Sequence, residues 1–110
     1  LADIPVDAQE KIMHLQMHEQ ALQQLLAQKQ ALQFQLMEIE SALRELQGTS
    51  EAYKIIGNIM VLSKTGELEA DLREKKETAE LRISSLEKQE ARTREKAAAL
   101  QKEVIASIRR

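Results

Sequence analysis

The sequence of 110 residues contains no cysteine, one proline and three glycines. Without cysteine there can be no disulfide, thiolate nucleophile or cysteine-ligated zinc site, and this composition fits a reducing compartment such as the cytoplasm. Aromatic residues make up only 2% of the chain, as Phe34 and Tyr53, whereas the cores of globular domains usually rely on several rings. A compact globular domain is therefore not the expected fold.

Charge and hydropathy exclude further classes of function. The net charge is −2, with acidic and basic residues intermixed, so there is no electrostatic basis for nucleic-acid binding. No apolar run approaches the ~18 residues that a membrane-spanning helix needs, and no secretory signal is visible. We expect a cytoplasmic protein that binds neither nucleic acid nor membrane.

The residues that are abundant point to long helices. Leucine, isoleucine and alanine are mixed with glutamine, glutamate, lysine and arginine, a composition typical of coiled coils. The glycines Gly48, Gly57 and Gly66 all lie in one short central stretch, so helix-breaking residues divide the chain into three parts. We predict one mostly α subunit over residues 1–110, with a helix at about 5–47, a β-hairpin at about 52–63 and a helix at about 66–109.

Both long parts carry apolar residues spaced alternately by three and four, which predicts a coiled-coil seam. The seam of the first helix combines two series, Leu15, Leu22, Lys29, Leu36 and Leu43 with Lys11, His18, Leu25, Leu32, Ile39 and Leu46. The seam of the second helix combines Leu72, Ala79, Leu86, Thr93, Leu100 and Ser107 with Glu69, Lys76, Ile83, Glu90, Ala97 and Val104. Because the helices have nearly equal lengths and a short connector, we predict that they pair antiparallel. Lys29 should form a polar layer with a carboxylate such as Glu87.

Local signals mark the helix ends. Pro5 suits a first helical turn, and Asp7 with Glu10 resembles a capping box. Gly48 is a plausible stop in the left-handed conformation. Thr65 is expected to cap the second helix.

The central stretch reads as a β-hairpin. Two β-branched, apolar runs flank Gly57 and Asn58, a pair typical of a two-residue turn. Pairing Ile56 with Ile59 leaves both faces apolar, and a lone two-stranded hairpin is marginal in water. We therefore expect hairpins from several chains to join into a shared sheet or barrel. The oligomerisation residues are Tyr53, Ile55, Ile56, Gly57, Asn58, Ile59, Met60, Val61 and Leu62.

Two coiled-coil helices that flank the segment Tyr53-Lys54-Ile55-Ile56-Gly57-Asn58-Ile59-Met60-Val61 resemble the β-class subunit of prefoldin. The runs Glu74-Lys75-Lys76-Glu77 and Leu86-Glu87-Lys88-Gln89-Glu90 add to this resemblance, and a connector with room for one hairpin favours the β-class over the α-class. The resemblance implies a hexamer of two α and four β subunits with a double β-barrel platform. It also implies an ATP-independent chaperone that captures unfolded proteins at its coiled-coil tips and delivers them to a group II chaperonin. The resemblance favours an archaeal source, with a eukaryotic β-class subunit as the alternative.

Apolar and basic side chains gather where the first helix begins and the second ends. A tip has no following layer to cover its apolar side chains, so they are candidates for client binding. The client-binding candidates are Ile4, Val6, Ile12, Met13, Met17, Val104, Ile105 and Ile108. Lys102, Arg109 and Arg110 are candidates for chaperonin docking, although cations also suit the last turn of any helix. Met37 and Met60 are assigned to packing.

Enzymatic function is not expected. His14 and His18 have the i, i+4 spacing of a metal pair, but no third ligand is evident, so we predict neither a metal site nor a cofactor. No phosphate-binding loop or catalytic triad can be assembled. Two other classes of function fit the sequence less well. A structural coiled-coil scaffold or tether leaves the apolar β segment unexplained, and a helical nucleic-acid-binding arm should carry a basic stripe.

Overall fold

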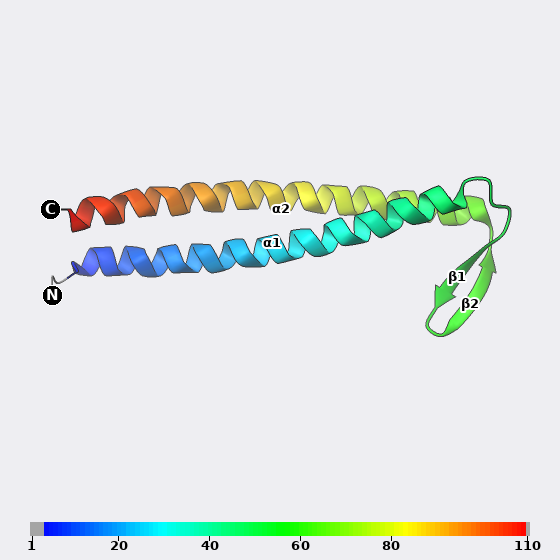
Figure 1. The fold of residues 1–110 in the computed structure, drawn as a ribbon, viewed down its shortest axis with the longest axis horizontal. Helices are drawn as coiled ribbons and strands as arrows, with labels where there is room; N and C mark the ends of the chain where they lie inside the picture. The colour runs from blue at the N-terminus through cyan, green and yellow to red at the C-terminus, as the bar shows by residue number, and fades with distance from the viewer. Residues whose placement is uncertain (1–3, 110) are drawn as a thin grey trace. The chain divides into compact units, whose positions relative to one another are not determined.

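The computed structural model describes residues 4–109. The chain forms helix α1 (Val6–Leu46), strands β1 (Ala52–Ile56) and β2 (Ile59–Ser63), and helix α2 (Thr65–Ile108) (Figure 1). Two long helices with one antiparallel hairpin between them confirm the predicted fold class. Arg110, one of the residues predicted to dock a chaperonin, lies outside the described residues.

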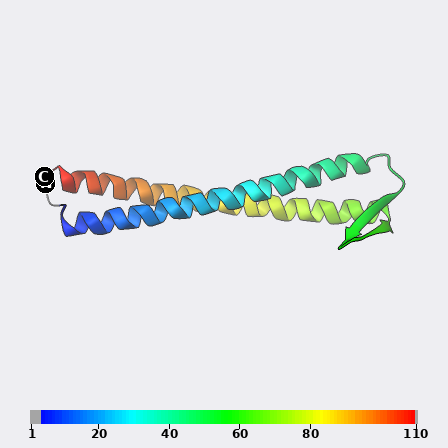
Figure 2. The ribbon, with the colours of Figure 1, turned by 60° about the horizontal axis from the view of Figure 1, so that its bottom comes forward.

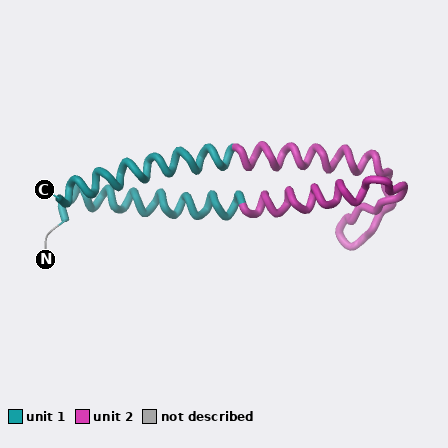
Figure 3. The backbone as a smooth tube through the Cα atoms, turned by 45° about the horizontal axis from the view of Figure 1, so that its top comes forward, with its two compact units in different colours: residues 1–29, 85–110 teal, residues 30–84 magenta. Residues whose placement is uncertain are grey.

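The chain divides into two compact units, coloured separately in Figure 3. Unit 1 comprises residues 1–29 and 85–110, in which the first part of α1 lies antiparallel to the last part of α2. Lys11 and Glu103 join these two helix segments, with Nζ and Oε2 3.6 Å apart. Unit 2 comprises residues 30–84, in which the remainder of α1 lies antiparallel to the start of α2, with the hairpin at the connector (Figures 1 and 2).

The buried side chains lie on the predicted seam, except Ala8, which is 0% exposed and precedes the seam residue Leu15 by one heptad. Leu43 and Ala79 are buried in unit 2, and Leu86 and Val104 are buried in unit 1. Other seam positions, such as Leu22 and the polar Lys29, are half-buried. Two paired helices can bury only one narrow stripe each. Large apolar side chains outside that stripe therefore stay exposed.

The start of α1 differs from the predicted capping box. Because the helix begins at Val6, Asp7 lies inside the first turn and cannot act as the N-cap. The Pro5 carbonyl instead accepts the first backbone bond of the helix, from the Gln9 amide at 3.0 Å, and the Gln9 side chain donates to the Ile4 carbonyl at 2.9 Å. Asp7 still suits this end of the helix, since its carboxylate faces the positive end of the dipole.

In the connector, one predicted helix-end residue is confirmed and another prediction is wrong. Gly48 adopts φ 75, the left-handed conformation expected directly after a helix. Thr65 does not cap α2, because the carbonyl of Lys64 already accepts the first backbone bonds of the helix. The Thr65 hydroxyl instead donates to the Thr49 carbonyl at 3.1 Å. That bond ties the start of α2 to the segment that follows α1.

Candidate functional site

The hairpin in unit 2 has the register that its sequence predicts. β1 and β2 pair antiparallel, with Ile56 opposite Ile59 and Tyr53 opposite Leu62. Gly57 has φ 59, whereas no residue other than glycine has a positive φ in the part of the chain that the structure describes. A glycine at the first central position is the signature of a type II′ turn, whose twist matches that of the strands. This register sends alternate residues to opposite faces.

Both faces of the hairpin are apolar and exposed. Exposure of the large side chains ranges from 42% at Val61 to 71% at Ile55. One face carries Tyr53, Ile55, Met60 and Leu62, and the other carries Lys54, Ile56, Ile59 and Val61. Open strand edges and uncovered apolar faces are features typical of surfaces that associate with other chains.

Several exposed apolar residues, in the hairpin and on the helices, differ from expectation. Met37 and Met60, both assigned to packing, are 57% and 65% exposed, so that assignment is wrong within the chain. Phe34 and Leu81 are also exposed, at 57% and 66%, and neither was assigned a role from the sequence. The sequence already predicts that both side chains are exposed, because neither falls on a seam position.

In unit 1 the start of α1 lies beside the end of α2 (Figure 3), and these two helix ends carry the predicted tip residues. The exposed members are Ile4, Val6, Met13, Met17, Ile105 and Ile108. Ile12 is half-buried, and Val104 is only 9% exposed, so these two side chains are largely covered and offer little surface to a client. Lys102 and Arg109 are exposed near the same end of α2.

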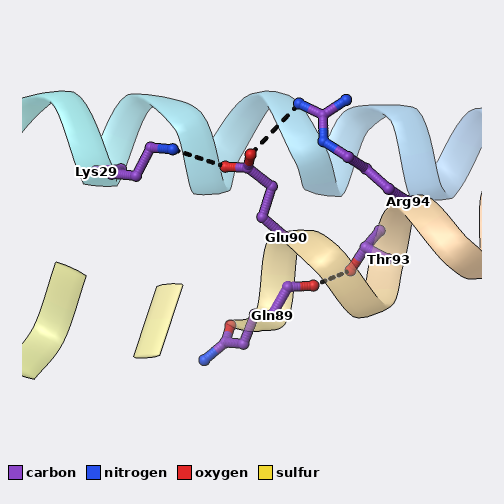
Figure 4. Close-up of polar contacts among 5 residues, drawn as sticks. All are labelled: Lys29, Gln89, Glu90, Thr93 and Arg94. Atoms are coloured by element: carbon purple, nitrogen blue, oxygen red, sulfur yellow. Dashed lines mark hydrogen bonds and ion pairs between the residues drawn. The ribbon is translucent and has the colours of Figure 1, made fainter. Parts of the chain in front are cut away.

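A polar cluster interrupts the seam of unit 1. Lys29 Nζ lies 3.1 Å from Glu90 Oε2, and Arg94 Nη2 lies 3.4 Å from Glu90 Oε1 (Figure 4). The polar layer at Lys29 is thus observed, but its expected partner Glu87 is wrong. The reason is helical phase: Glu90 occupies a seam position and is half-buried, whereas Glu87 is exposed.

The environment of Glu90 favours its ionised form. The ammonium group of Lys29 lowers the pKa of the Glu90 carboxyl group, burial opposes this shift, and Arg94 adds to the lowering. Lys29 and Glu90 are 16% and 17% exposed, so this pair is better shielded from solvent than the Lys11–Glu103 pair. The cluster is an electrostatic contact between α1 and α2, not an open site for a ligand.

The two histidines lie on α1, with His14 exposed and His18 half-buried at the seam. Among residues 4–109, no three histidine, cysteine or acidic side chains gather in a way that could hold a metal ion. Within the same residues, neither helix includes a stretch long and apolar enough to cross a membrane.

Comparison with known proteins gives consistent matches along the chain. A sequence profile described as "Prefoldin subunit" matches residues 9–110. Prefoldin subunit beta of Archaeoglobus fulgidus is 36% identical, over 94% of this chain and 92% of that protein. The same subunit of Thermococcus onnurineus is 32% identical, over 99% and 97%. The crystal structure of the prefoldin beta subunit from Thermococcus strain KS-1 superposes with a TM-score of 0.91 at 32% identity, covering 100% of this chain and 99% of that one.

Proposed function

This chain belongs to the prefoldin subunit family, whose members are chaperone subunits of hetero-oligomers, and we propose that it is a β-class subunit that holds unfolded proteins in the cytoplasm without ATP. The exposed apolar residues where α1 begins and α2 ends carry this proposal. They form a small apolar surface at the helix ends of unit 1, which suits weak and repeated contact with unfolded chains.

The proposed partners follow from the hairpin and the helix ends. The exposed hairpin joins an α-class subunit and further β copies into a hexamer of two α and four β chains. Several tips around one cavity then add avidity that a single tip lacks. Lys102 and Arg109, with Arg110 next in the sequence, dock a group II chaperonin that receives the client.

Replacing Val6 and Ile108 with glutamine tests client holding. These side chains are 70% and 54% exposed, so the change removes apolar surface at the tip without opening the seam. We expect each tip to lose ~1 kcal/mol of client-binding free energy. These losses add across the tips of one complex, so the overall affinity falls further. The measurement is suppression of aggregation of a denatured test protein, followed by light scattering, using the complex with an α-class subunit.

A matched control replaces Phe34 and Met37 with glutamine. Both are 57% exposed, but they belong to unit 2 and not to unit 1, which contains the proposed tip. This control should protect clients as well as the native chain does. Full protection by the Val6 and Ile108 variant would exclude the tip as the client site, and a chain that never suppresses aggregation would be a scaffold subunit instead.

A further inference from the structure

The outward side of α1 in unit 1 has a band of uncharged side chains, bordered by the exposed carboxylates of Glu10 and Glu19. We call this surface the outer face; its members are all exposed and are Met13, Gln16, Met17, Gln20, Gln23, Gln24 and Ala27. They recur at intervals of one, three or four residues along the helix, opposite the seam positions Leu15, Leu22 and Leu25. Met13 and Met17 also belong to the tip, so the outer face continues directly from the proposed client site.

The outward side of α2 is charged, so the lack of charge on the outer face of α1 is not a general property of unit 1. The outward side of α2 in unit 1 includes the exposed charges Lys88, Arg92, Glu95 and Lys102. Solvent-facing positions of coiled coils ordinarily carry such charges. The outer face of α1 holds glutamine, methionine and alanine at the same kind of position, so its composition needs a separate explanation.

The chemistry of the outer face matches an unfolded polypeptide. A glutamine amide offers the same donor and acceptor groups as a peptide bond, and an unfolded chain presents unpaired N–H and C=O groups along its length. Methionine is flexible and polarizable and fits apolar side chains of varied shape. A face without fixed charge neither attracts nor repels a client on account of its net charge.

We infer that the outer face is a second client-contact surface, one that holds backbone and apolar groups of unfolded polypeptides regardless of client charge. The inference rests on the proposed holding function. A second copy of this chain is a poorer occupant, since stable interfaces bury ~1,200–2,000 Å² around an apolar centre. The apolar side chains of the outer face are only Met13, Met17 and Ala27. Contacts this weak suit reversible holding at many points.

Adding charge to the outer face tests the inference. One variant combines Gln16→Glu with Gln23→Glu, and a second combines Gln16→Lys with Gln23→Lys; glutamate and lysine are both good helix formers, so α1 is kept. The probes are reduced lysozyme, a basic client, and reduced α-lactalbumin, an acidic one. The reductant leaves this chain unchanged because it has no cysteine. Aggregation is followed by light scattering with the complex containing an α-class subunit.

We expect the native chain to protect both probes and each variant to become charge-selective. The glutamate variant should need roughly two- to fivefold more complex to protect α-lactalbumin, and the lysine variant roughly two- to fivefold more to protect lysozyme. Opposite preferences cannot result from a shared folding defect. A control variant with Gln89→Glu and Gln101→Glu places the same charges at exposed positions of α2 in unit 1, and it should protect both probes like the native chain.

The variant with glutamine at Val6 and Ile108 runs beside these in the same assay. If it loses protection while both outer-face variants match the native chain on both probes, the holding function stands and the outer-face inference is wrong. If it protects fully and the outer-face variants are charge-selective, the outer face holds clients without the tip. A change in the sedimenting mass of the charged variants would show that the outer face packs against another copy, which also overturns the inference.

Discussion

Glu90 places a carboxylate in the seam of unit 1, where an apolar side chain would otherwise pack. Lys29 and Arg94 provide its counter-charges at 3.1 and 3.4 Å. Removing one member of a shielded pair leaves the other without its partner, which costs more than the intact pair contributes. Such polar layers favour one alignment of the two helices over its neighbours.

Because Glu90 is ionised, we expect the stability of the helix pair to depend on pH in the acidic range. Because the pKa of Glu90 is lowered in the folded chain, its contribution is present above the unfolded-state pKa and is lost as the pH falls through the folded-state pKa. The relevant range is therefore at and below the ordinary value of 4.5. We expect the native chain to melt at a higher temperature than Glu90→Gln at neutral pH, with a difference that shrinks in acid.

Circular dichroism melts of the two chains at several pH values measure this difference. Comparison with Glu90→Gln isolates Glu90 from the other carboxylates, which titrate in both chains. Glu87→Gln is the control, because Glu87 is exposed on the same helix. A melting difference that does not change with pH would show that Glu90 contributes through packing alone.

Single-residue contacts were the least predictable part of the site. The heptad pattern shows that Lys29 needs a carboxylate, but the choice between Glu87 and Glu90 depends on helical phase and antiparallel alignment together. The predicted helix caps were wrong for a related reason. The hydroxyl of Thr65 bonds to Thr49, a contact that depends on where the connector places a residue distant in the sequence.

At the scale of elements, the hairpin was the most predictable. Gly57 and Asn58 specify a two-residue turn, and such a turn fixes the pairing of every residue in both strands. The helices were nearly as predictable, because the seam series follow from backbone periodicity alone. The heptad pattern does not determine which exposed apolar residues contact other chains, since helical periodicity describes only the contacts between the two paired helices.

Replacing Ile55 or Ile59 with aspartate, one at a time, tests the hairpin as the assembly element. Ile55 and Ile59 lie on opposite faces. A charge buried without a partner costs several kcal/mol, so we expect at least one of these variants to lose the hexamer while its helical content remains. Sedimentation velocity with an α-class subunit measures assembly, and comparing the two variants shows which face is buried.

Leu81→Asp is the matched control for this experiment. Leu81 is 66% exposed, as Ile59 is, and it lies in unit 2 on α2, outside the hairpin. We expect its variant to assemble normally. An intact hexamer in all three variants would mean that the subunits associate through some other surface.

At the scale of the whole molecule, charge is distributed unevenly among the functional surfaces. The hairpin strands carry one charged residue, Lys54, and the outer face of α1 carries none. The end of α2 is basic, with Lys102 and Arg109 exposed and only Glu103 between them. In the proposed function, one end of unit 1 offers apolar contacts to clients and cations to an acidic partner.

Reversing the charges of Lys102 and Arg109 to glutamate tests whether the end of α2 docks a group II chaperonin. A contact between opposite charges at an exposed rim mainly speeds association and weakens as salt screens it. We expect the association rate, measured by surface plasmon resonance, to fall roughly tenfold at low salt, while client protection survives because Ile105 and Ile108 are kept. Lys88→Glu with Arg92→Glu is the matched control on the same helix, and its association rate should stay close to native. Native-like association of the Lys102 and Arg109 variant at every salt concentration would mean that these cations stabilise only the end of their own helix.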